Sequence, residues 1–206
     1  MSGRQSALER LIGAVSRETF SALSEYETEL VKWNQQINLV SPSTLATAWD
    51  RHIVDSAQLI PLARNAQTWV DLGSGGGFPG IVAAIFRKEQ PDSQTILVES
   101  NRKKAGFLRH LIGRFDLPAR VDSVRIEDYI TDNAAPDIIS ARALAPLIDL
   151  LDAVEPWLER GSRALFHKGR DYAAEIEQVP DIERYDLVKH VSAVDAESVI
   201  LEIRRR

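Results

Sequence analysis

Cysteine is absent from the 206 residues of this chain, so disulfide bonds, thiolate catalysis and cysteine-ligated metal sites are all excluded. Long apolar runs are absent too, because none approaches the roughly 20 residues that a bilayer-spanning helix requires. The first stretch of the chain mixes arginines and glutamates with short apolar pieces, which is typical of an amphipathic helix and not of a signal peptide. We therefore expect a soluble protein of the cytoplasm that does not bind membranes.

Positively charged residues are also fewer than negatively charged ones. The chain carries 25 lysines and arginines against 30 aspartates and glutamates, for a net charge of -5. This balance disfavours a general nucleic-acid coat protein, whose affinity comes from neutralising phosphates. A local basic face is still possible, because steering depends on where the charges lie and not on their sum. No histidine-rich metal spacing occurs, and we expect no metal.

Residues 1–66 show apolar residues at helical spacing and predict an N-terminal helical cap that belongs to the same folding unit as the rest of the chain. Ser16 is expected to cap a first long helix there. A second helix is expected over residues 45–63. Its predicted buried stripe consists of Leu45, Trp49, Ile53 and Leu59.

Residues 67–206 have a different rhythm, in which short apolar runs alternate with helical stretches. The runs lie at 68–72, 95–100, 119–124, 137–143 and 163–169, and the helical stretches at 82–88, 103–115, 147–159 and 171–178. Such alternation predicts a doubly wound, mostly parallel sheet. The last two runs, 183–194 and 197–206, predict a closing antiparallel hairpin. The expected fold class is therefore α/β, with seven strands.

A burst of glycines follows the first predicted strand. Gly75 to Gly80 satisfy the dinucleotide pattern G-x-G-x-x-G, a weak match by itself. Gly73, Gly75 and Gly77 form the alternative pattern G-x-G-x-G, just after Asp71 at the strand end. A pyrophosphate beside that carboxylate is electrostatically poor. The ammonium and sulfonium of S-adenosylmethionine suit it better, so Asp71 favours that cofactor over NAD.

Two later segments bear on the same ligand. Glu99 ends the second predicted strand, where a carboxylate can accept both ribose hydroxyls of an adenosyl group. This supports adenosyl binding without choosing between cofactors, and the alternative for Asp71 and Glu99 is a pair of solvated strand-end charges. Residues 125–128 follow the third strand, where a loop can meet the adenine edge. A plain helix start with favourable acids is an equally good interpretation of that segment.

Six motifs together are specific. They are KWNQQINLVS, RHIVDS, WVDLGSGGGFPG, ESNRKKAGFLR, ISARALAPL and FHKG, between Lys32 and Arg170. The set strongly resembles the bacterial small-subunit ribosomal RNA guanine-N7 methyltransferases, also called the glucose-inhibited division protein B family. The resemblance implies a class I S-adenosylmethionine-dependent methyltransferase fold. It also implies an enzyme that methylates one guanine in a loop of 16S ribosomal RNA near the decoding centre of the small subunit.

The resemblance also carries over cofactor contacts by matching motif. It implies that Gly73 and Phe78 bind the cofactor, that Ile126 and Glu127 lie beside the adenine, and that Arg142 lies near the reacting end. With the residues argued above, the predicted cofactor site comprises Asp71, Gly73, Gly75, Gly77, Phe78, Glu99, Ile126, Glu127 and Arg142. Gly76 and Phe78 stand where the family often has proline and leucine, and Ile37 where it often has tyrosine. These departures remove no charge and no needed glycine.

The implied chemistry needs no general base, because guanine N7 has an in-plane lone pair and no proton to lose. Orientation can supply about 7–11 kcal/mol of the barrier. Arg142 and Lys168 follow the fourth and fifth predicted strands, where α/β sheets place ligands, and we expect them to act as positioning groups. His52 invites a role as base, but a packed structural role is the preferred interpretation.

The RNA phosphates require positive partners. The expected ones are Arg102, Lys103, Lys104, Arg109 and Arg114 on one helix, with Arg125, Lys168 and Arg170. A solvated polar face is the alternative for the helical set. The predicted partner is 16S ribosomal RNA or the assembled small subunit, bound by a monomer.

Three competing functions stay open at this point. A small-molecule methyltransferase would leave the basic helix unexplained. An NAD-dependent oxidoreductase is disfavoured by Asp71. A non-catalytic ribosome-assembly factor that binds the same cofactor is compatible with the sequence, because binding and catalytic residues coincide when orientation is the mechanism.

Overall fold

Seven strands form one mixed sheet in the computed structural model, which describes residues 3–206. Their order is β3-β2-β1-β4-β5-β7-β6. The strands are β1 (Thr68–Leu72), β2 (Gln94–Val98), β3 (Ala119–Asp122), β4 (Ile138–Arg142), β5 (Arg163–Lys168), β6 (Tyr185–Val191) and β7 (Val199–Arg205). The first five pair in parallel, so their carboxyl ends meet at one edge of the sheet. The predicted α/β class and strand number are confirmed.

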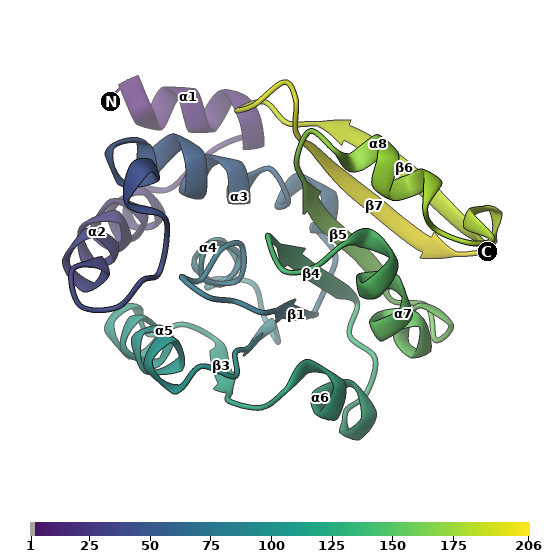
Figure 1. Ribbon diagram of the computed structural model, residues 1–206. Helices are drawn as coiled ribbons and strands as arrows, with labels where there is room; N and C mark the ends of the chain where they lie inside the picture. The colour runs from purple at the N-terminus through teal and green to yellow at the C-terminus, as the bar shows by residue number, and fades with distance from the viewer. Residues whose placement is uncertain (1–2) are drawn as a thin grey trace.

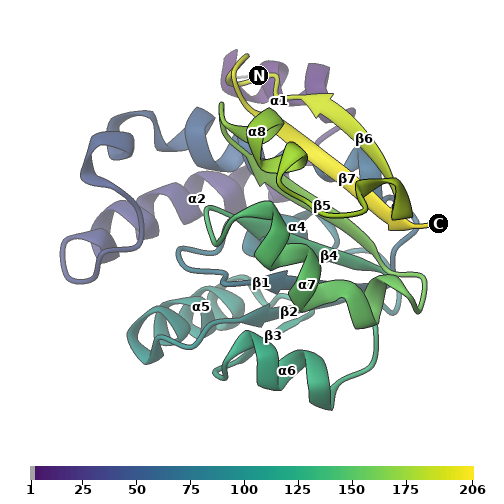
Figure 2. The same ribbon diagram turned by 45° about the vertical axis from the view of Figure 1, so that its right-hand side comes forward.

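The last two strands form the predicted antiparallel hairpin. It joins the sheet through its second strand, because β7 pairs antiparallel with β5 and leaves β6 at the outer edge. The loop between them, residues 192–198, lies beside α1 in both views (Figure 1 and Figure 2). The hairpin therefore brings that loop toward the N-terminal helices, far from it in sequence.

The helical elements surround the sheet. They are α1 (Gly3–Ile12), α2 (Arg17–Asn34), η1 (Pro42–Thr47), η2 (Trp49–Val54), α3 (Asp55–Ala57), η3 (Pro61–Ala63), α4 (Gly80–Phe86), α5 (Arg102–Phe115), α6 (Ile126–Asp132), α7 (Leu147–Leu158), α8 (Tyr172–Glu177) and η4 (Ile182–Arg184). The sequence reading of strand and helix stretches agrees with these bounds within a few residues. For the start of α6, a helix start and a loop at the adenine edge were equally good interpretations, because this short acidic segment has little apolar periodicity.

Strand alternation sorts the core into two main layers. Val70 and Leu72 of β1 point to the layer that contains α6 and α7. Leu97 of β2 points to the opposite layer, which contains α2, α4 and α5. Alternate residues of a strand face opposite sides of a sheet, so the cap helices and α4 share one face, as Figure 1 shows. Asp71, which lies between Val70 and Leu72, must point to that cap-side face.

Side-chain caps begin the two longest helices. The Ser16 hydroxyl accepts from the Thr19 amide at 3.0 Å at the start of α2, which confirms the predicted cap. The Asn101 side chain accepts from the amides of Lys103 and Lys104 at 3.0 and 3.2 Å at the start of α5. These bonds satisfy amides that have no partner within the helix. They also start α5 directly after the carboxyl end of β2.

The predicted second helix of the cap is divided into a 3-10 segment (η1), a π segment (η2) and a short α segment (α3). A 3-10 turn (η1) leads into a π turn (η2), in which the amide of Asp55 bonds to the carbonyl of Asp50. Trp49 and Ile53 are buried as predicted, whereas Leu45 is only half-buried. The change of turn type interrupts the spacing that a uniform helix would give, which is why the predicted stripe fails at its first member. No helix in residues 3–206 combines the length and apolar character needed to cross a membrane.

Truncating Leu151 tests the α7 layer, because this side chain is 1% exposed within the core. We expect Leu151→Ala to lower the free energy of unfolding by about 2–5 kcal/mol, since it removes buried methyl groups and leaves a cavity. Denaturant titration measures the loss. The control is Val188→Ala on β6, where the side chain is 50% exposed and a change within about 0.5 kcal/mol is expected. Equal losses for both variants would contradict the assignment of the core.

Candidate functional site

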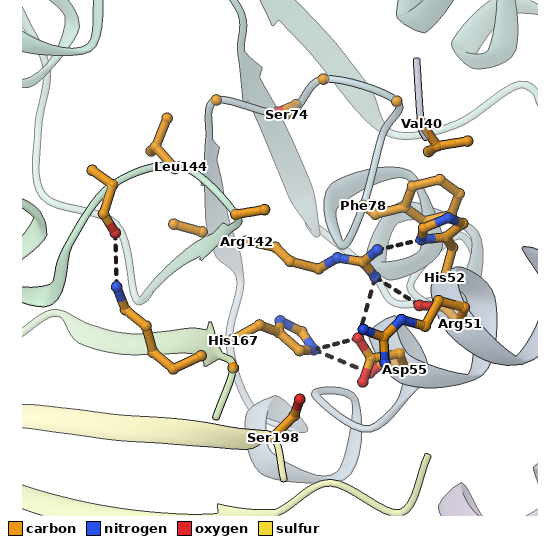
Figure 3. A pocket seen from close by; sticks show the side chains of 18 of the residues that line it. Val40, Arg51, His52, Asp55, Ser74, Phe78, Arg142, Leu144, His167 and Ser198 are labelled. Atoms are coloured by element: carbon orange, nitrogen blue, oxygen red, sulfur yellow. Dashed lines mark hydrogen bonds and ion pairs between the residues drawn. The ribbon is translucent and has the colours of Figure 1, made fainter. Parts of the chain in front are cut away.

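A cavity of about 770 Å³ opens at the carboxyl ends of β1, β4 and β5. Its wall consists of the glycine loop after β1, the turns after β4 and β5, part of the helical cap, and the loop before β7. Figure 3 shows the labelled side chains that line it. Ligand sites of α/β sheets lie at this edge, and the volume is within the usual range for binding pockets, about 300–1,000 Å³.

The glycine loop presents bare backbone to the cavity. Gly75 has a φ of 54° and Gly77 a φ of 94°, values that side-chain-bearing residues rarely adopt. A Cβ on Gly77 would lie 2.6 Å from the hydroxyl oxygen of Tyr26, so this position also needs glycine for space. The Tyr26 hydroxyl donates to the carbonyl of Gly76 at 2.5 Å. The cap helix α2 therefore holds the loop in place.

Asp71 does not lie where the sequence reading put it. Its side chain is fully buried below the loop and is not part of the cavity wall. One carboxylate oxygen accepts from the Ser140 hydroxyl at 2.6 Å, and the other accepts from the amide of Gly80 at 3.2 Å. Burial raises the pKa of Asp71 to about 6, against the effect of these hydrogen bonds. The expected direct contact with a cationic ligand is not available, and the residue instead fixes the loop and the start of α4.

Glu99 lies beside the loop, as expected for the carboxyl end of β2. Its two carboxylate oxygens accept from the amide of Gly75 at 2.8 Å and from the amide of Asn101 at 2.7 Å. The side chain thus joins the glycine loop to the start of α5. A carboxylate oxygen can accept more than one hydrogen bond, so a contact with ribose hydroxyls stays a prediction compatible with this geometry.

Phe78 lies in a stack of rings at the cavity wall. Its ring is 5.0 Å from that of Tyr26 and 5.0 Å from that of His52, with interplanar angles of 20° and 27°. The guanidinium carbon of Arg142 lies 5.5 Å from the centre of the Phe78 ring, within the range of a cation–π contact. Phe78 and His52 are both buried, so the stack closes one side of the cavity and connects the cap to the loop.

Arg142, the last residue of β4, extends across the cavity wall to the cap (Figure 3). Its guanidinium donates to the Arg51 carbonyl at 3.2 Å, to the Asp55 carboxylate at 3.2 Å and to Nδ1 of His52. Its side chain is 17% exposed. The next residue, Ala143, has a φ of 50°, a strained conformation of the kind found at functional turns. The structure therefore places Arg142 in the cavity as predicted, while its action on a ligand stays a prediction.

The histidine in RHIVDS has both ring nitrogens in use. Because Arg142 donates to Nδ1 of His52, the proton of the neutral ring is on Nε2, which donates to the Thr44 hydroxyl at 2.9 Å. Burial, followed by the charges of Arg142 and Arg51, lowers the pKa of His52 to about 3. The ring is neutral near pH 7 and has no free lone pair for a proton. The structural interpretation of His52 holds.

Two further wall residues were missed by the sequence reading of the site. His167, on β5, donates from Nε2 to the Asp55 carbonyl at 3.1 Å, and its Nδ1 is buried with no partner within the described chain. Burial lowers the pKa of His167, so this ring is neutral as well. The second missed residue, Asp55, stands three positions after His52 in the motif RHIVDS. That helical spacing was the one signal in the sequence that the side chains of His52 and Asp55 share a face.

The predicted contact between Lys168 and RNA phosphates is wrong, because the Lys168 side chain is only 6% exposed. The ammonium donates to the Ala145 carbonyl at 2.7 Å and to the Glu175 carboxylate at 2.6 Å. Glu175 also accepts from the amide of Leu147 at 2.6 Å. Lys168 therefore ties α8 to the turn that follows β4 and shapes the cavity wall, and its charge is already paired.

The basic residues of α5 do not form one surface. Arg102 and Lys103 are exposed at the start of the helix, beside the cavity edge, and Lys104 lines the cavity itself. Arg109 donates to the Val121 carbonyl at 3.3 Å. Arg114 pairs with Glu25 of α2, about 18 Å along the helix from Arg102 at 1.5 Å per residue. Arg114 therefore lies away from the cavity, and its contact with RNA phosphates stays a prediction.

The remaining predicted residues are at other positions around the edge. Arg170, after β5, is exposed and has no ion-pair partner within residues 3–206. Arg125 pairs with Glu127 at 3.6 Å, and both side chains are largely exposed. Ile126 begins α6 and packs on the core of that layer, so the segment is a helix start. Neither Ile126 nor Glu127 lines the cavity, and their contact with adenine stays a prediction.

No cluster of three histidine, aspartate or glutamate side chains within residues 3–206 could hold a metal ion. The turn after α2 is capped by Asn34, whose side-chain oxygen accepts from the amides of Leu39 and Val40, both at 2.9 Å.

Comparisons with known proteins add to this geometry. The family model described as rRNA small subunit methyltransferase G matches residues 19–202. A protein named Ribosomal RNA small subunit methyltransferase G from Chelativorans sp. (strain BNC1) is 51% identical over 203 residues, covering 98% of this chain and 97% of that protein. A protein of the same name from Brucella canis is 53% identical over 200 residues, covering 97% and 94%.

Among solved structures, a SAH-bound methyltransferase from Podospora anserina matches with a TM-score of 0.64 at 12% identity, covering 98% of this chain and 93% of that one. At that identity the likeness shows the fold alone. The fold is that of the class I methyltransferases, as the sequence predicted, with β7 antiparallel between β5 and β6.

The pKa of Asp71 provides a test of its buried hydrogen bonds with Ser140 and Gly80 below the glycine loop. Because the pKa is raised from 3.8 to about 6, the folded protein holds this proton more tightly than the unfolded chain does. The stabilisation is fully present below pH 3.8 and is lost as the pH rises to about 6. We expect the unfolding free energy of the wild type, relative to Asp71→Asn, to fall by about 2 kcal/mol between pH 4 and 7.

Carbon-13 NMR of the carboxyl group checks the same shift directly. A resonance that is absent from Asp71→Asn and titrates near pH 6 is the expected result. A midpoint at the ordinary aspartate value would contradict the burial of this group.

Proposed function

Because the chain belongs to the small-subunit ribosomal RNA methyltransferase G family, we propose that it transfers a methyl group from S-adenosylmethionine to N7 of one guanine in 16S ribosomal RNA. The observation that carries this proposal is a cavity at the cofactor edge of the sheet whose side chains are not placed to take a proton from a ligand. Both ring nitrogens of His52 are hydrogen-bonded, the unpartnered Nδ1 of His167 is buried, and the carboxylates of Asp55 and Glu175 are paired with Arg142 and Lys168.

Such a site suits guanine N7. The atom has an in-plane lone pair and no proton, so the reaction needs alignment and no acid–base catalysis. When bound, S-adenosylmethionine supplies an electrophilic methyl group on its sulfonium. The N–C bond forms as the S–C bond breaks, which leaves 7-methylguanine and S-adenosylhomocysteine. The task of the chain is to hold both partners in line and to exclude water.

The residues of the cavity fit this cofactor. The bare backbone of Gly73 and Gly75 allows a ligand to come close, and the Glu99 carboxylate lies at the loop where ribose hydroxyls would bind. Ile126 and Glu127 would lie beside the adenine. Arg142 would orient the reacting end, with its guanidinium carbon 5.5 Å from the centre of the Phe78 ring. The buried Asp71 would act through the shape of the loop.

The RNA would approach across the same edge. Arg102, Lys103, Lys104 and Arg170 provide positive charge around the cavity in a chain whose net charge is -5, and phosphates would be drawn to that local charge. Extruding a loop guanine costs only a few kcal/mol, because the base is already partly unstacked. As part of the same proposal, the chain acts as a monomer in the cytoplasm, where the small subunit is assembled.

The test is methyl transfer to small subunits that lack the modification. Labelled S-adenosylmethionine is incubated with the protein and the subunits, and digestion with mass spectrometry then locates any 7-methylguanine. One new 7-methylguanine in 16S ribosomal RNA is the expected result. If cofactor binds but neither subunits nor naked RNA are methylated, the proposal is wrong.

Arg142 provides the sharpest single test of the reacting end. We expect Arg142→Ala to reduce kcat/KM for methyl transfer by about 100- to 1,000-fold, as the loss of one well-placed donor does in other enzymes. Thermal unfolding followed by circular dichroism checks that the variant is folded. Activity within threefold of the wild type would exclude Arg142 from the site.

The two ends of α5 provide a matched pair for the RNA surface. We expect Arg102→Ala/Lys103→Ala to weaken binding to the small subunit at least fivefold and to reduce the salt dependence of binding by about two phosphate contacts. Arg114→Ala on the same helix should leave affinity within twofold, because this side chain is paired with Glu25 at the far end. Filter binding at several salt concentrations measures both. Equal losses would favour a general charge effect over a local surface.

A further inference from the structure

Among residues 3–206, Asp55 is the one negatively charged group in contact with the Arg142 guanidinium. Its Oδ2 accepts from Arg142 at 3.2 Å, while the other two partners of that guanidinium are a carbonyl and a neutral imidazole. The side chains of the pair are 17% and 16% exposed. Because the contact is largely withdrawn from water, it constrains the arginine more strongly than a surface ion pair would.

Asp55 also connects four parts of the fold. It begins α3 in the cap and holds β4 through Arg142. Its Oδ1 accepts from Gln58 at 3.0 Å and from the Ser192 hydroxyl in the β6–β7 loop at 3.3 Å. Its carbonyl accepts from His167 of β5 at 3.1 Å. Figure 3 shows His167 and Arg142 converging on this one residue from the sheet.

The direction of Arg142 depends on this arrangement. The side chain leaves the end of β4 and could extend into the cavity toward solvent. Instead it runs along the Phe78 ring, with its guanidinium carbon 5.5 Å from the ring centre, and ends at the cap. Phe78 contributes a face but no directed hydrogen bond. Directed bonds come from the Arg51 carbonyl, Nδ1 of His52 and the Asp55 carboxylate. Of these three partners, the Asp55 carboxylate alone also balances the charge of the guanidinium.

We propose that Asp55 is a positioning residue for methyl transfer, which acts by holding Arg142 in the orientation that the reaction uses. The inference rests on the proposed function and deepens it, since it extends the active site from the sheet edge into the RHIVDS segment of the cap. Asp55 touches neither reactant in this role. Its effect on the reaction passes through Arg142.

The chain offers a matched control for a purely structural role. Glu202 of β7 pairs with Arg163 of β5 at 3.0 Å, and their side chains are 14% and 21% exposed. This pair is close to Asp55–Arg142 in length and burial. It lies at the amino end of β5, away from the cavity. Glu202 also pairs with Arg204 at 3.2 Å and with His190 at 2.9 Å. Glu202→Gln thus removes a comparably buried carboxylate charge, together with these ion pairs, without touching the site.

The experiment compares Asp55→Asn, Asp55→Glu and Glu202→Gln in the full chain. Asp55→Asn is expected to lower kcat at least tenfold while KM for small subunits changes less than threefold. Asp55→Glu, which restores the charge, should recover at least part of the loss. Glu202→Gln should keep kcat within twofold. Thermal unfolding should show similar losses of stability for Asp55→Asn and Glu202→Gln.

A double variant tests whether the effect passes through Arg142. In the Arg142→Lys background, adding Asp55→Asn should change kcat by less than threefold, because the geometry that Asp55 holds is already lost. A tenfold further loss would overturn the inference. So would an Asp55→Asn variant whose kcat matches that of Glu202→Gln.

Cofactor affinity separates this inference from the proposed function. Calorimetry with S-adenosylhomocysteine needs no RNA, and Asp55→Asn is expected to bind it at least fivefold more weakly than Glu202→Gln does. A wild-type protein that methylates no RNA would overturn the proposed function. The affinities of Asp55→Asn and Glu202→Gln for S-adenosylhomocysteine would then test the role of Asp55 separately. Equal affinities of these two variants would overturn that role.

Discussion

The buried carboxylate of Asp71 is the constraint on which the site depends. It receives the Ser140 hydroxyl from β4 and the amide of Gly80 from the start of α4, and Ser140 in turn receives the indole N–H of Trp69 at 2.8 Å. The space is so tight that a Cβ on Gly80 would lie 2.7 Å from the Asp71 carboxylate. With β1, β4 and α4 joined in this way, the glycine loop has one path available, and its backbone faces the cavity.

The helical cap completes what the sheet begins. Tyr26 holds the glycine loop from α2, and His52 stacks on Phe78 from η2. Asp55 reaches the ends of β4 and β5 through Arg142 and His167. The cavity is therefore a product of the cap and the sheet together, and the division of the chain at residue 66 marks a change of sequence rhythm. Whether the two regions fold as one unit stays a prediction.

Much of this architecture is predictable because it depends on local periodicity. The strands, the closing hairpin and the glycine loop each have a pattern within a few neighbouring residues. The errors at Asp71 and Lys168 share a different cause. Their partners are Ser140 and Glu175, and no local pattern reveals whether a charged strand-end residue faces a ligand or turns back to such a partner. Asp55 was overlooked for the same reason, since its contacts lie on β4, β5 and the β6–β7 loop.

The order of the last two strands has a consequence for biosynthesis. The strand β6 pairs only with β7, and β7 pairs with β5, so β6 has no place in the sheet until the chain after it has been made. Ser198 and Val199, at the start of β7, also line the cavity. A nascent chain that ends before β7 can hold the glycine loop and the cap but lacks one wall of the cavity. The wall of the cavity is therefore complete only when β7 has been made and has paired with β5.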